Sequence, residues 1–210
     1  LMAWRRGSRF ETAGILYTLI SRSAPEFWVG MILLTLFAFN LKWLPASGAT
    51  SPGVIYASFW DQLTSLDFWR HLILPGLTLM FYLQGLPMLL MRSNMLDVMQ
   101  EDFVTLARMK GISEWKIMLR HAARNALLPV VTAMAMGIGF TMGGDVVVET
   151  IFSWPGLGRM LVRAVSARDY PVAQGAFLTL AAVMVFLNLL ADLLYYWLDP
   201  RVGRSKEMSV

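Results

Sequence analysis

Residues 72–91 have the sequence LILPGLTLMFYLQGLPMLLM, a run of 20 residues without a charged side chain. The hydrocarbon core of a bilayer is about 30 Å thick, and an α-helix needs about 20 apolar residues to cross it. Because lipid offers no hydrogen-bond partners, a crossing segment must satisfy its backbone internally, as a helix does. The run therefore predicts a membrane-spanning helix and an all-α fold in a bilayer.

Three further windows extend this pattern. Residues 125–144 and 170–191 are also uncharged and long enough to span. Residues 27–41 form a shorter window that follows apolar residues 12–20 across Pro25, and such a window is also compatible with an interfacial or re-entrant segment. The sequence thus predicts one polytopic helical domain over residues 1–210, with four spans at about 14–44, 71–92, 125–148 and 171–198.

The composition fits the same class. Hydrophobic residues make up 57% of the chain and charged residues 15%, against about 25% charged residues in soluble domains. The chain contains no cysteine, which excludes disulfide scaffolds and cysteine-rich metal sites. The net charge of +4 raises the question of a nucleic-acid partner, and the answer depends on where the basic residues lie.

The basic residues are distributed unevenly between the connecting segments. Four crossings place residues 1–25, 92–124 and 199–210 on one side and residues 42–70 and 149–171 on the other. The first side carries 13 of the 18 basic residues and the second carries five. The positive-inside rule puts the first side in the cytoplasm. Topology therefore explains the charge, and no nucleic-acid partner is expected.

The cytoplasmic connector 92–124 has a pattern of its own. A short helix that ends at Gly111 is predicted, and its weakly apolar face consists of Phe103, Leu106, Ala107 and Lys110. Ser113 suits the N-cap of a second short helix, and Ile112 with Ile117 has the spacing of a hydrophobic staple. Two helices meeting at a glycine form either a compact docking element or an amphipathic segment lying on lipid headgroups.

Two stretches of this connector carry a family resemblance: EDFVTLARMKGIS at residues 101–113 and RHAARNALLP at residues 120–129. They resemble the loop that defines permease subunits of ABC-type importers, and most closely the dipeptide and oligopeptide branch. In that family the first helix of the loop inserts into a cleft on a separate ATPase subunit. Thr105, Leu106 and Ala107 then match the family's Glu-Ala-Ala position. The coupling residues that the resemblance implies are Glu101, Asp102, Thr105, Leu106, Ala107, Arg108, Lys110 and Gly111.

Further motifs extend the resemblance over nearly the whole chain: FWVG at 27–30, WLPASG at 43–48, PGLG at 155–158, RDYP at 168–171, NLLAD at 188–192 and LDPR at 198–201. The resemblance implies a type I ABC importer transmembrane domain in a bacterial or archaeal plasma membrane. Its expected partners are a homologous second permease, two cytoplasmic ABC ATPase subunits and an extracytoplasmic substrate-binding protein. Its expected cargo is di- or oligopeptides, with nickel chelates, glutathione or another small solute as alternatives.

Members of this family usually have six spans, whereas four are predicted here. We therefore expect the chain to be N-terminally incomplete, and its start at Leu1 without an initiator Met favours the same interpretation.

No residue pattern predicts catalysis. The chain has no G-x-x-x-x-G-K-[ST] motif, and no lysine directly follows a glycine, so ATP hydrolysis is expected in another subunit. His71 and His121 have no second His or Cys at ligand spacing, so no metal site and no cofactor are expected. The chain is predicted to be a transport subunit, not an enzyme. The alternative of a different class is a channel or membrane scaffold without an ATPase partner.

Asp145 and Asp192 lie in or near predicted spans, where acidic residues are functional candidates. An intramembrane aspartyl protease would need two acids close enough to share a proton. Counting a rise of about 1.5 Å per residue places Asp145 near the outer surface and Asp192 near the inner one. This separation argues against the protease.

Small residues mark the predicted span 125–148, including Gly139 and Gly143 at a four-residue step that permits close helix approach. Packing between helices is one explanation. The functional alternative is that this face, with Asp145 and Glu149 at its outer end, lines a translocation path between two permease subunits. The outer segment 149–170 is predicted to be an interfacial or re-entrant element. The resemblance implies that it helps to close the outer gate or meets a substrate-binding protein.

Overall fold

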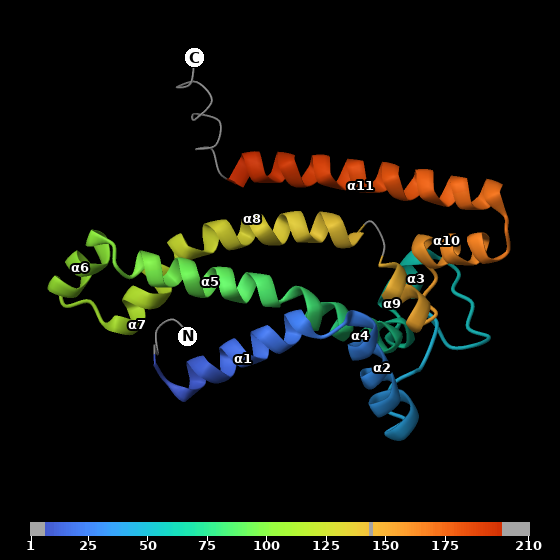
Figure 1. Ribbon diagram of the computed structural model, residues 1–210, viewed down its shortest axis with the longest axis horizontal. Coiled ribbons are helices and arrows are strands. Elements are labelled where there is room, and N and C mark those ends of the chain that lie inside the picture. The colour runs from blue at the N-terminus through green and yellow to red at the C-terminus, as the bar shows by residue number, and fades with distance from the viewer. Residues whose placement is uncertain (1–6, 143–144, 199–210) are drawn as a thin grey trace, which may run out of the picture. The chain divides into compact units, whose positions relative to one another are not determined.

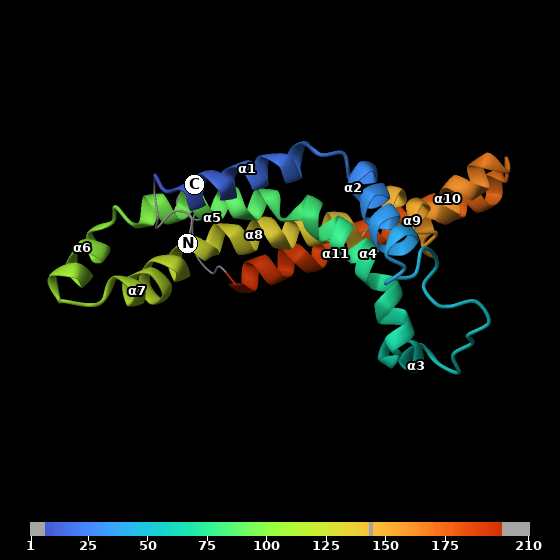
Figure 2. The same cartoon turned by 90° about the horizontal axis from the view of Figure 1, so that it is seen from below.

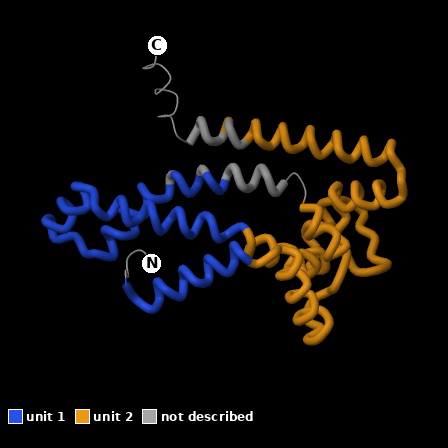
Figure 3. The backbone as a smooth tube through the Cα atoms, in the orientation of Figure 1, with its two compact units in different colours: residues 1–23, 83–137 blue, residues 24–82, 138–210 orange. Residues whose placement is uncertain are grey.

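The computed structural model describes residues 7–142 and 145–198, and every regular element within them is a helix (Figure 1). The predicted all-α fold is therefore confirmed for this part of the chain. Contacts divide the chain into two compact units, one formed by residues 1–23 and 83–137 and the other by residues 24–82 and 138–210 (Figure 3).

The first unit consists of antiparallel helices and the connector between two of them. Its helices are α1 (Arg9–Ser23), α5 (Gly85–Val98), α6 (Asp102–Met109), α7 (Glu114–Lys116), the π-helix η2 (Ile117–Ala122) and the start of α8 (Ala123–Met142). Helices α1 and α5 lie side by side in both ribbon views (Figures 1 and 2). Gly85 permits this approach, because a Cβ there would lie 2.5 Å from Cγ of Arg22. Helix α5 also packs on the continuous stretch η2–α8, through a core of Met95, Met118, Ala122 and Ala126.

An ion pair links the start of α1 to α5. Arg92 donates from Nε and Nη2 to Oε1 of Glu11, at 3.0 and 2.5 Å. Glu11 is buried, with 5% of its surface exposed, and it also accepts a hydrogen bond from the backbone of Gly7 at 2.6 Å. A buried charge is costly unless it is paired and hydrogen-bonded, so this pair fixes α1 beside the start of the connector.

The second unit packs around a small apolar core. Its helices are α2 (Glu26–Leu33), the π-helix η1 (Leu34–Asn40), α3 (Phe59–Thr64), α4 (Leu66–Leu83), α9 (Val146–Ile151), α10 (Leu157–Ser166) and α11 (Tyr170–Leu198). Leu74, Val148 and Phe152 form the core. Gly30 on α2 faces it, since a Cβ there would lie 3.4 Å from the ring of Phe152. The backbone N–H of Gly48 donates to the carbonyl of Phe152 at 2.9 Å, which fastens the long loop before α3 to the same core.

Two helical stretches of the described residues are long and apolar enough to cross a membrane, Leu66–Val98 and Tyr170–Leu190. A third is present if Arg9–Ser23 and Glu26–Asn40 together count as one broken span. The break falls at Pro25, whose carbonyl accepts the N–H of Trp28 at 3.0 Å. The span predicted from the sequence at about 14–44 includes this proline. The number and direction of the crossings stay predictions.

Candidate functional site

The connector that follows α5 folds as a short helix with a defined end. Helix α6 starts after Glu101, whose backbone is extended, and ends before Gly111, which has φ +71°. The N–H of Gly111 donates to the carbonyl of Arg108 at 2.9 Å, and the N–H of Ile112 donates to that of Ala107 at 3.2 Å. These two bonds form a Schellman motif, which requires a left-handed residue at the glycine position. The predicted end at Gly111 is confirmed.

Helix α6 buries one side against the residues that follow it in the connector. Val104 and Ala107 are buried against Ile117, with Phe103 partly buried beside them. Leu106, which the sequence put on the weakly apolar face of this helix, is 55% exposed. Residues three apart share a helix face, so packing on Ile117 selects 104 and 107 and turns Leu106 outward.

The second short helix of the connector is the beginning of a longer one. Helix α7, η2 and α8 follow one another without a break, because the residues at their junctions, Ile117 and Ala123, have right-handed helical backbone angles. Ser113 stands at the N-terminus but makes no side-chain capping bond. The predicted staple is present, since Ile112 and Ile117 belong to one apolar cluster.

The connector presents an apolar surface outward in this chain. Leu106, Met109 and Trp115 are 55%, 78% and 58% exposed. Beside them Arg108 pairs with Glu114, with 3.0 Å between Nε and Oε1. Of the eight coupling residues named from the sequence, Ala107 is buried and the other seven are exposed. We call Leu106, Met109 and Trp115 with the Arg108–Glu114 pair the docking surface.

The acidic residues of the outer segment have local hydrogen-bonding roles. Asp145 caps α9 by accepting the N–H groups of Val147 and Val148 at 3.1 and 3.0 Å. Glu149 accepts the N–H of Arg159, in the first turn of α10, at 2.7 Å. Carboxylates at helix N-termini satisfy free N–H groups and complement the helix dipole. Each acid thus anchors the start of one of these helices.

The PGLG motif provides the space that Glu149 needs. A Cβ on Gly156 would lie 2.2 Å from Cδ of Glu149. A Cβ on Gly158 would lie 2.8 Å from Cγ2 and 3.0 Å from Cα of Val146. The two glycines therefore let α9 and α10 approach each other closely.

The structure describes the predicted translocation path only in part. Gly139 lies within α8, while Gly143 lies outside the described residues, and so does the side chain of Asp192. Asp145 and Glu149 both lie in the first turn of α9 or at its N-cap. That Gly139, Gly143, Asp145 and Glu149 line a translocation path stays a prediction.

Two features of the second unit have no counterpart in the sequence-based expectations. The carboxyl group of Glu26, at the first turn of α2, lies beside that of Asp145, and its Oε1 is buried without a hydrogen-bond partner among the described residues. The second feature is a pocket beside His71, lined by Lys42 and Arg70, which are far apart in the sequence. Among the described residues no three His, Asp or Glu side chains are placed to hold a metal ion.

Comparison with known proteins gives a consistent result. The family model described as binding-protein-dependent transport system inner membrane component matches residues 1–204. The di/tripeptide transport system permease protein DppB of Pseudomonas aeruginosa is 39% identical over 217 residues, covering 98% of this chain and 65% of the relative.

Two further relatives have similar identity. The glutathione transport system permease protein GsiC of Pectobacterium atrosepticum is 40% identical over 199 residues, or 95% of this chain and 59% of the relative. The dipeptide transport system permease protein DppB of Escherichia coli K12 is 38% identical over 220 residues, or 98% and 65%. The chain spans roughly three fifths of the length of these relatives, from 59% to 65%.

Proposed function

Because the chain belongs to the family of binding-protein-dependent transport system inner membrane components, we propose that it is a permease subunit of an ATP-driven importer. It pairs with a homologous permease, binds two cytoplasmic ATPase subunits and receives its cargo from an extracytoplasmic binding protein. Its membrane is the plasma membrane of a bacterium or archaeon. The subunit supplies a conduit with alternating access, and its partners hydrolyse ATP.

The observation that carries this proposal is the docking surface. The connector has its own core of Val104, Ala107 and Ile117, so the element is folded before any partner binds. Leu106, Met109 and Trp115 are then exposed without contributing to that core. Exposed apolar side chains rimmed by charges are typical of protein interaction sites. A preformed element also loses little conformational entropy on binding.

We propose di- and oligopeptides as the cargo. The relatives reported above are named for dipeptides, di/tripeptides and glutathione, and glutathione is itself a small peptide. Dipeptides, tripeptides and glutathione share a short peptide backbone and a free carboxylate. Other small solutes of the family, such as nickel chelates, are the alternative.

The docking role is tested by placing a charge on the docking surface. In the complete transporter, reconstituted in vesicles, Leu106→Glu is expected to lower peptide uptake by about tenfold or more, because an unpaired charge buried at an interface is strongly unfavourable. Uptake, ATP hydrolysis and co-purification of the ATPase are measured together. Leu106→Met keeps an apolar side chain of similar size and is expected to retain uptake. Full uptake and normal ATPase binding in Leu106→Glu would contradict the proposal.

We further propose that the small-residue face of α8, with Asp145 and Glu149 at its outer end, lines the translocation path. Leucine in place of Gly139 or Gly143 is then expected to abolish uptake while membrane insertion and ATPase binding continue. Uptake at the unsubstituted rate would contradict the proposal that these glycines line the path.

A further inference from the structure

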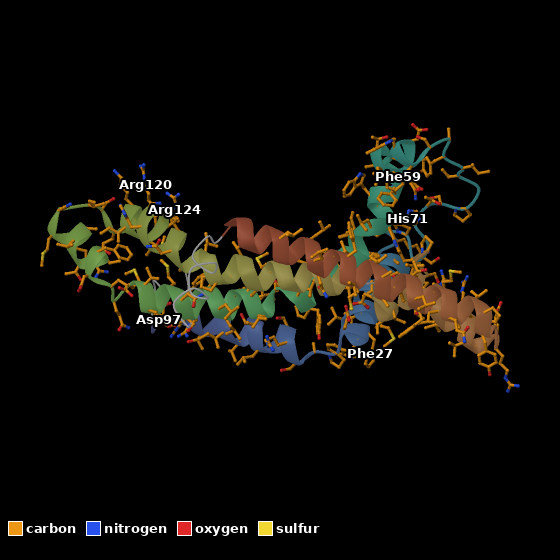
Figure 4. The ribbon with its side chains drawn as sticks, turned by 90° about the horizontal axis from the view of Figure 1, so that it is seen from above. Phe27, Phe59, His71, Asp97, Arg120 and Arg124 are labelled. Atoms are coloured by element: carbon orange, nitrogen blue, oxygen red, sulfur yellow. The ribbon has the colours of Figure 1, made fainter. Side chains whose placement is uncertain are left out.

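A small pocket lies in the second unit, where the loop after η1 passes the N-terminal half of α4. Its volume is about 280 Å³, and Lys42, Trp43, Asp67, Arg70 and His71 are among the residues that line it. Lys42 and Trp43 come from the loop, and the other three come from α4. Figure 4 labels His71 on α4. Ligand sites for drug-sized molecules start at about 300 Å³, so this pocket suits a single small group.

His71 is the most buried polar side chain of the pocket, with 5% of its surface exposed. Its Nδ1 lies 2.8 Å from the backbone carbonyl oxygen of Asp67, and a carbonyl can only accept, so Nδ1 carries the proton. Nε2 has no hydrogen-bond partner among the described residues. This nitrogen donates to a ligand when the ring is protonated and accepts a ligand O–H when the ring is neutral.

The carboxylate of Asp67 lies among donors from the loop and beside His71, whose Nδ1 is 3.6 Å from Oδ1. The N–H and hydroxyl of Ser51 donate to its two oxygens at 2.8 and 2.6 Å, and the hydroxyl of Tyr56 is 3.4 Å from one of them. Tyr56 also bonds to Ser65 at 2.6 Å, so Ser51 and Tyr56 fasten the loop to the start of α4. Asp67 therefore organises the pocket and leaves little acceptor capacity for a cation.

The two cations of the pocket are not neutralised. Arg70 donates from Nη2 to the carbonyl of Trp43 at 3.3 Å, which orients the guanidinium and leaves its other N–H groups available. Neither Arg70 nor Lys42 has a carboxylate within ion-pair distance in the part of the chain that the structure describes. Two free cations beside a buried imidazole favour a negatively charged oxygen group.

We propose that this pocket binds an oxyanion, a carboxylate or a phosphate group, between Lys42, Arg70 and Nε2 of His71. The site needs no ATPase and no transport cycle, so it goes beyond the function proposed above. A peptide C-terminus and a lipid headgroup are the two sources of such a group near a membrane. Both present the same chemistry to Arg70 and Lys42.

The experiment uses the two histidines of the chain as reporters. The full chain is purified in a phosphate-free maltoside detergent with 13C-labelled histidine, which gives two ring Cε1–H signals. The His121→Gln variant assigns the signal of His71. Inorganic phosphate and glycylglycine are titrated at constant ionic strength, with potassium chloride and glycylglycine amide as controls. The His71 signal is expected to shift saturably with phosphate or glycylglycine, while the His121 signal stays in place.

Substitutions test whether the named cations hold the anion. Lys42→Gln and Arg70→Gln are each expected to weaken the apparent affinity by about tenfold, as loss of a charged hydrogen bond does. Arg163→Gln removes a basic residue of the same unit outside this pocket and is expected to leave the affinity unchanged. Lys42→Gln also protects the test against misfolding, because Lys42 makes no bond to the described part of the fold.

The source of the oxyanion is distinguished by a third arm. The same signal is compared in nanodiscs of phosphatidylglycerol and in detergent. A shift with the lipid and none with glycylglycine assigns the site to a headgroup, and the reverse assigns it to a peptide carboxylate. A His71 signal that moves with none of phosphate, glycylglycine and phosphatidylglycerol overturns the proposal. Equal shifts in chloride, or an affinity unchanged by both Lys42→Gln and Arg70→Gln, overturn it as well.

Discussion

Two connectors of this chain each join short helices around glycines, and they use glycine for opposite reasons. In the connector 92–124 Gly111 has φ +71°, and no described atom lies within 4 Å of its Cβ position. In the outer segment Gly156 has an extended backbone with φ −140°, but its Cβ position is occupied by Glu149. One connector needs the conformation that glycine permits, and the other needs its small size. Glycine in a motif therefore has no single physical meaning.

The two connectors also differ in where their charged groups point. In the outer segment Asp145 and Glu149 are used within the protein, as caps for α9 and α10. In the connector 92–124 Arg108 and Glu114 pair on the surface at 3.0 Å, beside exposed apolar side chains. A segment that satisfies its polar groups internally is stabilised by the fold. A segment that leaves its surface open is available to a partner.

The largest expected effect is that of Gly158→Ala. The added methyl group would approach the backbone of Val146 to 3.0 Å and its side chain to 2.8 Å, and backbone cannot move aside without separating α9 from α10. Overpacking of this kind costs roughly 1–3 kcal/mol. Hydrogen–deuterium exchange over residues 146–166 of the purified protein is expected to rise strongly. Ala164→Gly, a cavity-forming change on the same helix, is the control for a general loss of helix stability. Unchanged exchange in Gly158→Ala would mean that the glycine is not needed for space.

A smaller effect is expected for Gly156→Ala, because the methyl group meets only the end of the Glu149 side chain. A flexible side chain can swing away, but Glu149 then loses its 2.7 Å bond to the N–H of Arg159. Loss of a helix cap costs about 1 kcal/mol. Exchange at the first turn of α10 is expected to rise.

A double-mutant cycle of Gly156→Ala and Glu149→Ala tests whether the clash with Glu149 causes the effect. In a Glu149→Ala background the cap is already absent and the space is open, so Gly156→Ala is expected to add almost nothing. Additive effects of the two substitutions on hydrogen exchange would rule out the clash with Glu149 as the cause.

The difference between the connectors also explains how much could be predicted from the sequence. The end of α6 at Gly111 depends on a local signal, a glycine after a helical run, and the structure confirms it. The role of Glu149 depends on a contact with Arg159 across a loop, which residue spacing does not encode. The sequence made no prediction of which side of α6 is buried, because Ile117, eleven positions beyond Leu106, decides it.

His71 illustrates the same limit. In the sequence no second histidine lies at ligand spacing from His71, so no site was predicted there. In the structure Lys42 lies at the same pocket although it is 29 positions away. Helical spans and their apolar length are local properties that a sequence shows directly. Pockets built from a loop and a distant helix arise only after the chain has folded.

The smallest expected difference is that between alanine and asparagine at Gly111, and it is the sharpest test of the comparison. Because its Cβ position is open, a side chain meets no obstacle, and the whole cost comes from φ +71°. Alanine at such a position costs about 1 kcal/mol, whereas asparagine adopts this conformation more readily. Gly111→Asn is therefore expected to keep hydrogen-exchange protection of residues 102–112 closer to that of the unsubstituted chain than Gly111→Ala does. At Gly156 the order is reversed, since a larger asparagine displaces Glu149 further than alanine. If both sites rank alanine and asparagine in the same order, the distinction between conformation and space fails.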